Sequence, residues 1–176
     1  MAKGLGVAER AAYERDGYLA PIPVFSEAEA GELRRRFEDM ESRYPGADRK
    51  LYSRPHLLAP WLDALIRHPG LLDVAESLFG PDILCCHFGI RDKAPGPYHA
   101  GWHQDAMYVK IEPAFSVWIA VTGLNRENGG LRAIPGSHEW PLLPHRDSDD
   151  PNSVLTRGQY ITAEFDESAA IDVVLR

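Results

Sequence analysis

The spacing of apolar residues changes at Gly80-Pro81, and this change limits the folds open to the chain. Before this point apolar residues recur at intervals of three and four, as on one face of an α-helix. After it, short stretches rich in branched and aromatic residues are separated by Pro, Gly and Asn, as in strands joined by turns. Helices followed by strands predict an α-helical flank, residues 1–81, on a mainly β core, residues 82–176.

Capping signals place the expected helices within the flank. Ser26 and Glu29 have the spacing of a capping box, so a helix should begin at Ser26, and Tyr44-Pro45-Gly46 should end it. Gly80-Pro81, a C-cap glycine followed by a residue that cannot continue a helix, should end the last one. Besides the helix at Ser26, we expect helices at residues 7–16, 61–67 and 71–79.

The second half of the chain predicts an antiparallel sandwich or jelly roll. Residues 125–130 have the composition of a hairpin turn, because Asn-Gly supplies positions with positive φ. The polar segment 138–158 should be a long loop that lies over a site. Strands are expected at residues 83–90, 103–109, 114–122, 131–134, 159–164 and 171–175.

Length and charge exclude several classes of function. A chain of 176 residues is long enough for a single domain with a buried core. Its net charge of −7 argues against binding to a nucleic-acid backbone, and no apolar run predicts a membrane span or a signal peptide. Cys85 and Cys86 are adjacent, a spacing that strains a disulfide, so we expect two free thiols and a cytoplasmic location.

His103 and Asp105 form the motif with the most chemical content. Two residues apart on an extended segment, they should project from the same face of a strand. An imidazole beside a carboxylate makes up two thirds of the 2-His-1-carboxylate site that holds non-haem Fe(II). A chain with seven histidines can contain such a pair by chance, so a surface turn is the alternative for the motif alone.

Several motifs together resemble the phytanoyl-CoA dioxygenase family. The likeness begins in the flank, at residues 13–18 and 78–82, and therefore runs over nearly the whole chain. The motifs that carry it most specifically are Trp102-His103-Gln104-Asp105, Trp118, Glu127-Asn128-Gly129-Gly130-Leu131 and Ile134-Pro135-Gly136-Ser137-His138. The resemblance implies a cupin-like double-stranded β-helix and an Fe(II)- and 2-oxoglutarate-dependent dioxygenase that uses O₂ to hydroxylate an unactivated C–H bond of a small-molecule or acyl substrate.

The resemblance also implies roles for individual residues. His103 and Asp105 would be catalytic iron ligands, and the carboxylate of Asp105 favours hydroxylation over the halogenation seen where that position is empty. Trp118 would lie against 2-oxoglutarate, although a core aromatic is an equal alternative. Arg91 and Lys93 would face the co-substrate or substrate, with a solvated strand end as the alternative and Arg91 as the preferred candidate.

The sequence departs from the family pattern at its far end. The second iron-binding histidine and the arginine that holds 2-oxoglutarate belong after residue 176, so we expect the sheet to lack its last strands and iron to bind weakly. His138 is expected near the rim of the site, and His145 is expected to face solvent. We therefore expect a truncated or partly recorded form of a longer oxygenase, which intact mass spectrometry would test.

Two other functions stay open on the sequence. A non-catalytic jelly-roll module, or an inactive fragment, would keep the His103/Asp105 pair as a relic and bind a ligand without turnover. A cupin-like enzyme using Zn or Mn would need further histidines near His103, and His99 is the one candidate there. The sequence indicates neither the substrate nor the oligomeric state.

Overall fold

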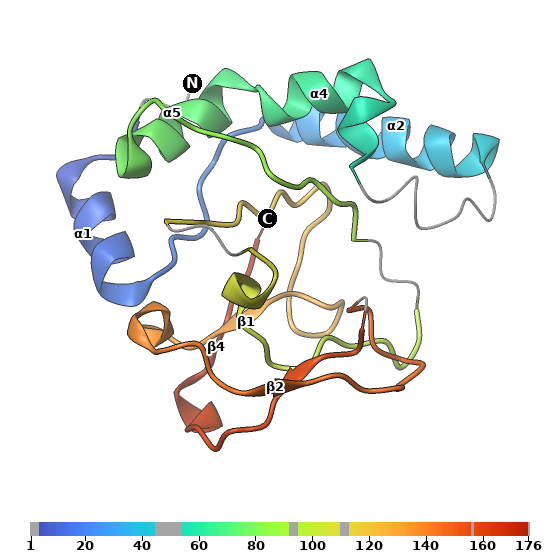
Figure 1. Ribbon diagram of the computed structural model, residues 1–176. Coiled ribbons are helices and arrows are strands. Elements are labelled where there is room, and N and C mark those ends of the chain that lie inside the picture. Colours follow the sequence, from blue (N-terminus) through green and yellow to red (C-terminus); the bar gives the residue numbers. More distant parts are fainter. Residues whose placement is uncertain (1–3, 45–53, 92–94, 110–112, 156, 176) are drawn as a thin grey trace.

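The computed structural model describes residues 4–44, 54–91, 95–109, 113–155 and 157–175. Three helices run along one side of the molecule, with α1 beside them, and the short strands lie on the opposite side (Figure 1). The helices are α1 (Val7–Asp16), α2 (Glu27–Arg43), α4 (Pro60–Ile66) and α5 (Pro69–Phe79). The strands are β1 (Arg132–Ala133), β2 (His145–Arg146), β3 (Tyr160–Ile161) and β4 (Ile171–Asp172).

Helix α2 confirms the predicted capping box. The Glu29 backbone N–H donates to Ser26 Oγ at 3.3 Å, and the Ser26 backbone N–H donates to Glu29 Oε2 at 2.8 Å. These two bonds satisfy amide groups that the first turn of a helix leaves without partners. On the solvent-exposed face of α2, residues 34–36 form exposed ion pairs within the helix. The Phe37 ring packs edge-on against Trp61 at 5.0 Å and joins α2 to α4.

Aromatic side chains connect the helices to the second half of the chain. Phe79, the last residue of α5, stacks on Phe115 with ring centroids 4.3 Å apart and receives the edge of Tyr13 from α1 at 6.0 Å. The Gly136 backbone N–H donates to the carbonyl oxygen of Asp16 at 2.8 Å. The flank is therefore held at the residues around 115 and 136, on either side of the predicted turn.

Within the described residues, the strands form two small antiparallel sheets rather than a closed barrel. β1 pairs with β4, placing Arg132 opposite Asp172, and β2 pairs with β3, placing His145 opposite Ile161. An isolated bridge between Leu124 and Leu175 extends the first pairing. Each strand has two residues, so the prediction of a mainly β protein is wrong for the described residues, where helix predominates.

Three of the predicted strands are wrong. Residues 83–90 contain one bridge residue, residues 114–122 contain none, and residues 103–109 include the 3₁₀-helix η2 (Asp105–Met107). A strand needs a neighbour that completes its hydrogen bonds, and apolar alternation alone does not supply one. The carbonyl of Phe88, for instance, accepts a hydrogen bond from Arg54 in a loop.

Among the described residues, buried apolar side chains are few and lie mainly in the helical half. Leu62, Leu65 and Ala75 are buried in α4 and α5, and Leu5 is buried before α1. Ile134 and Gln159 are buried in the half that carries the strands. Among the described residues, no helix is long and apolar enough to cross a membrane. The assignment of residues 1–81 and 82–176 to one domain stays a prediction.

Candidate metal centre and the adjoining cleft

His103 and Asp105 face each other at the start of η2. His103 Nε2 lies 3.4 Å from Asp105 Oδ1. Asp105 does not alternate along a strand, as the sequence predicted, but begins a 3₁₀ turn in which the Tyr108 N–H donates to the Asp105 carbonyl at 2.9 Å. The turn brings the carboxylate back toward the imidazole, so the pair forms for a different reason from the one expected.

The backbone of Gly101 sets the orientation of the His103 ring. His103 Nδ1 is 2.8 Å from the Gly101 carbonyl oxygen. Because a carbonyl oxygen can only accept, Nδ1 carries the proton and Nε2 points toward Asp105. The Tyr108 ring lies edge-on to the imidazole with centroids 6.4 Å apart. In the neutral imidazole, Nε2 therefore offers its lone pair on the side where the carboxylate lies.

Ser116 holds the other oxygen of Asp105. Its hydroxyl donates to Asp105 Oδ2 at 2.6 Å, which leaves Oδ1 for His103. Ser116 lies within residues 114–122, which the sequence predicted to be a strand, and no functional role was expected for it. The signal that would have indicated one, a hydroxyl eleven residues from a carboxylate, is common and has no fixed structural meaning.

The pair shifts the pKa of each partner. The hydrogen bond that the His103 imidazole donates to the Asp105 carboxylate raises the pKa of His103, against the opposing effect of burial. The hydrogen bonds from His103 and then Ser116 lower the pKa of the Asp105 carboxyl. Without metal, the two side chains thus favour an imidazolium–carboxylate ion pair, and a metal ion would have to displace the proton on Nε2.

A neutral imidazole and a carboxylate are suitable ligands for Fe(II), so the donor chemistry at His103 and Asp105 fits two of the three protein positions in such a site. Hydrogen bonds at the outer atoms of metal ligands are also typical of metal sites: here the Gly101 carbonyl accepts from His103 Nδ1, and the Ser116 hydroxyl donates to Asp105 Oδ2. Within the described part of the chain, no group of three or more His, Cys, Asp or Glu residues could hold a metal ion.

The other predicted site residues are Arg91, Trp118 and Lys93. The charge of Arg91 acts weakly on both groups: it opposes the rise in the pKa of His103 and adds to the fall in the pKa of Asp105. Arg91 Nη1 also donates to the carbonyl of Ile90 at 3.1 Å. The Trp118 side chain is 41% exposed, so it is not a core aromatic. Lys93 lies outside the described residues.

Two further histidines make specific contacts. His145 was expected to face solvent, but it is half-buried and its Nε2 accepts a hydrogen bond from the backbone N–H of Gln104 at 3.1 Å. His138 contacts the end of α1, where its Nε2 lies 3.2 Å from the carbonyl oxygen of Glu14. Neither histidine joins the pair formed by His103 and Asp105 in the described structure.

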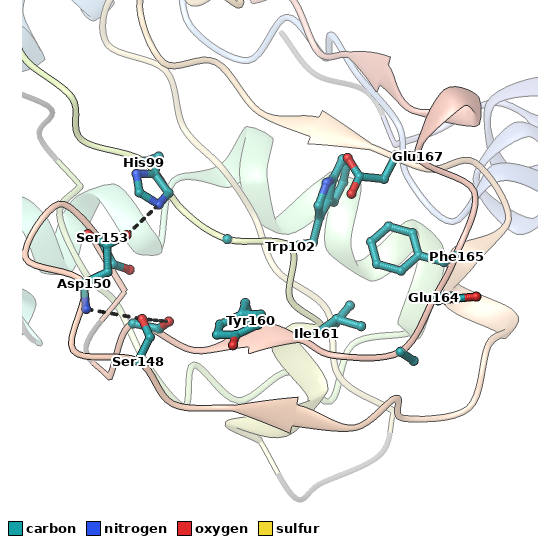
Figure 2. A pocket seen from close by; sticks show the side chains of 13 residues that line it. His99, Trp102, Ser148, Asp150, Ser153, Tyr160, Ile161, Glu164, Phe165 and Glu167 are labelled. Carbon is teal, nitrogen blue, oxygen red and sulfur yellow. Dashed lines mark hydrogen bonds and ion pairs between the residues drawn. The ribbon is translucent and has the colours of Figure 1, made fainter.

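A cleft of about 770 Å³ has Gly101 and Trp102, the two residues before His103, in its lining (Figure 2). The polar segment 138–158, predicted to be a loop over a site, contributes Ser148, Asp150, Ser153 and Gly158 to its walls, and the other lining residues come from 99–102 and from positions after 158. Trp102 meets Phe165 edge-on at 5.9 Å, and at the other end His99 Nε2 lies 3.3 Å from Asp150 (Figure 2). Of the described residues that line the cleft, none is His103 or Asp105.

Comparison with known proteins agrees with the motif. Residues 13–167 match the model of a family described as phytanoyl-CoA dioxygenase (PhyH). The chain is 25% identical over 170 residues to the peroxisomal phytanoyl-CoA dioxygenase of Bos taurus, covering 80% of this chain and 50% of that protein. It is 29% identical over 159 residues to an ectoine dioxygenase of Bordetella parapertussis, covering 78% of this chain and 51% of that one.

A solved structure gives the same result at the level of the fold. The non-heme monooxygenase ThoJ, in its apo form, superposes with a TM-score of 0.70 at 30% identity, covering 94% of this chain and 64% of that chain. The chain spans about half the length of the curated relatives it matches. On the extent of the family match, this chain belongs to the phytanoyl-CoA dioxygenase family, whose members use Fe(II) and 2-oxoglutarate.

Proposed function

We propose that this chain carries the iron-binding pair of an Fe(II)- and 2-oxoglutarate-dependent dioxygenase that hydroxylates an unactivated C–H bond. The observation that carries the proposal is the 3.4 Å approach of His103 Nε2 to Asp105 Oδ1 in a member of this family. His103 and Asp105 would hold the iron. When bound, Fe(II) and 2-oxoglutarate supply the overall oxidation in which R–H, O₂ and 2-oxoglutarate become R–OH, succinate and CO₂.

The residues around the pair would prepare it for this role. The Gly101 carbonyl keeps the proton on His103 Nδ1, and the Ser116 hydroxyl occupies Asp105 Oδ2, so one nitrogen and one oxygen remain for a metal. Arg91 would supply positive charge for a carboxylate of 2-oxoglutarate or substrate. Trp118 would form an apolar wall beside the co-substrate. That Lys93 supplies positive charge in the same way as Arg91 stays a prediction.

The relatives support a substrate class rather than one compound. They are named for phytanoyl-CoA in one case and for ectoine in another. We therefore propose a small-molecule or acyl substrate for the protein that contains this chain. A cytoplasmic location also stays a prediction, which fractionation of the source cells would test.

Two measurements test the proposal: succinate release from 2-oxoglutarate in the presence of Fe(II) and O₂, and metal binding at the pair. Binding is followed by the broadening of backbone amide signals near His103 and Asp105 when Mn(II) is added. We expect site-specific broadening in the parent chain and its loss in His103→Ala. The matched control is His99→Ala, because His99 pairs with Asp150 in the cleft. The absence of both signal broadening and succinate release in the parent chain would contradict the proposal.

A second candidate function is a non-catalytic ligand-binding module or inactive fragment. One observation favours it: among the described residues, no third metal donor joins His103 and Asp105. This alternative predicts Mn(II) binding at the pair, or ligand binding in the cleft, without succinate release. A cupin-like Zn or Mn enzyme is less well supported, because His99, the further histidine that it would need, contacts Asp150 instead.

A further inference from the structure

Gln104, the residue between the two candidate ligands, is held by a segment far along the chain. Its side-chain Nε2 donates to the Pro141 carbonyl at 3.1 Å, and its Oε1 accepts from the Leu143 N–H at 2.8 Å. A carboxamide has one donor end and one acceptor end, and here both are used in the same short segment. Neither Glu, which lacks the donor, nor Leu, which lacks both groups, could make these two bonds.

His145 continues the same arrangement onto the backbone of Gln104. Its Nε2 accepts from the Gln104 N–H at 3.1 Å, while its Nδ1 donates to the Leu143 carbonyl at 2.7 Å. Because a backbone N–H can only donate and a carbonyl can only accept, these contacts define one neutral tautomer of His145, with the proton on Nδ1. Residues 141–145 therefore contact Gln104 through both its side chain and its main chain.

These contacts are made at Gln104, where the backbone changes from an extended segment to the 3₁₀ turn η2. The carbonyl of Trp102 still accepts a hydrogen bond from the N–H of Ile161 in β3, but Asp105 already belongs to η2. Gln104 is the residue at which the extended segment becomes a turn, and the Gln104 carbonyl accepts the first bond of that turn from Met107 at 3.1 Å. The direction of the chain at Gln104 thus determines how closely Asp105 approaches His103.

We propose that Gln104 and His145 are positioning residues that hold His103 and Asp105 at the separation a metal ion requires. This inference rests on the proposed function, because it assigns a purpose to the spacing of the pair. Outer-shell partners of metal ligands typically change metal affinity about 10- to 100-fold when removed. We expect an effect of that size from Gln104→Leu, which keeps the approximate volume of the side chain and removes both of its hydrogen bonds.

The first measurement needs no metal. Long-range ¹H–¹⁵N spectra of the metal-free chain, recorded above the titration range of its histidines, report which ring nitrogen carries the proton. In the parent chain we expect Nδ1–H for both His103 and His145, as their carbonyl partners require. Gln104→Leu should shift His103 toward the Nε2–H form that predominates in free histidine.

The second measurement is the apparent dissociation constant for Mn(II), obtained from the broadening of signals at His103 and Asp105. Gln104→Leu and His145→Leu should weaken binding about 10- to 100-fold. His145→Gln should restore most of the affinity, because the end of a glutamine side chain can place an oxygen where Nε2 accepts from the Gln104 N–H. The far-UV circular dichroism of each variant shows that it remains folded.

The matched control is Thr162→Val. Thr162 Oγ1 donates to the Pro144 carbonyl at 3.2 Å, so this variant removes one hydrogen bond to the same segment without touching Gln104. It should change neither the His103 tautomer nor the Mn(II) affinity. Parent-like tautomers and affinity in both Gln104→Leu and His145→Leu would overturn the inference. If the parent chain neither binds Mn(II) at the pair nor releases succinate, the proposed function fails and the tautomer of His103 alone decides the inference.

Discussion

At the scale of single residues, the chemistry of this chain depends on which atoms of His103 and Asp105 are already occupied. The Gly101 carbonyl accepts a hydrogen bond from His103 Nδ1–H, and the Ser116 hydroxyl donates one to Asp105 Oδ2. The remaining atoms, Nε2 and Oδ1, are the two that face each other. An ion pair and a metal site use these same two atoms, so protons and metal ions compete for them.

This competition predicts a pH dependence of stability in the metal-free chain. The raised pKa of His103 means that its contribution to folding is fully present below the ordinary value of about 6.5 and is lost as pH rises through the raised pKa. The lowered pKa of Asp105 means that its contribution is present above about 3.9 and is lost as pH falls through the lowered pKa. The stabilising effect of the pair should therefore be largest between about pH 4 and pH 6.5.

Urea unfolding of the parent chain and of His103→Gln, in the presence of a chelator from pH 4 to pH 9, measures this effect. The difference in the free energy of unfolding should be largest in the acidic range and should decrease above it. In an Asp105→Asn background the difference should lose its maximum in the acidic range, because the partner charge is absent and burial then opposes protonation of His103. A difference that is independent of pH in the parent background would show that the ion pair does not form.

At the scale of elements, the end of α1 shows how the helices are attached to the second half of the chain. Gly17 ends the helix with φ of 77°, and its N–H donates to the Tyr13 carbonyl at 2.7 Å. The last turn of α1 then contacts the turn after β1, where His138 lies against the carbonyl of Glu14. A cation or N–H donor at the C-terminal end of a helix is favourable, because the carbonyl groups there lack partners.

Gly17→Ala should destabilise the chain for two reasons. A left-handed conformation costs a residue with a Cβ atom about 1–2 kcal/mol, and the added Cβ would overlap the ring of His138. We therefore expect the free energy of unfolding to fall by at least about 1 kcal/mol. Thermal unfolding followed by circular dichroism measures this change.

Gly31→Ala is the matched control, because Gly31 lies within α2 and a Cβ there would meet nothing closer than the Arg35 guanidinium at 3.8 Å. Replacing a glycine by alanine inside a helix stabilises it by roughly 0.5–1 kcal/mol. The two substitutions are chemically identical and should have opposite signs. A neutral Gly17→Ala variant would mean that α1 is not docked on His138 as described.

At the scale of the whole molecule, the chain exposes more surface than its mass suggests. Its accessible surface is 12339 Å², whereas a compact protein of this mass exposes roughly 8,600 Å² by the usual scaling. Large apolar side chains contribute to the excess, among them Leu57 at 71%, Leu58 at 68% and Leu84 at 78% exposure. Family membership implies a double-stranded β-helix, but the two sheets of the described residues are not closed.

The exposed apolar surface predicts binding of the dye anilinonaphthalene sulfonate by the folded chain at neutral pH. Such dyes become fluorescent on apolar surface that compact native proteins keep buried. The emission should be stronger than with a compact single-domain protein of similar mass and should decrease in a Leu57→Ser, Leu58→Ser double variant. Equal emission from this chain and from the compact protein would mean that these side chains are covered in solution.

The sequence alone determined the features that depend on near neighbours along the chain. Ser26 and Glu29 cap α2 within one turn, and Gly80 ends α5, so their residue types predicted both boundaries. His103 and Asp105 are two residues apart, and their chemistry could be inferred although the predicted strand was wrong. Local geometry restricts such pairs whatever the rest of the fold does.

Only the tertiary structure decided what orients the pair. Ser116 reaches Asp105 across 11 positions, and His145 reaches Gln104 across 41, so neither contact follows from local spacing. The same holds for the strands, because residues 114–122 alternate well yet find no strand partner in the described structure. Hydrogen bonds between distant segments depend on the path of the whole chain, and a sequence pattern specifies only which residues could make them.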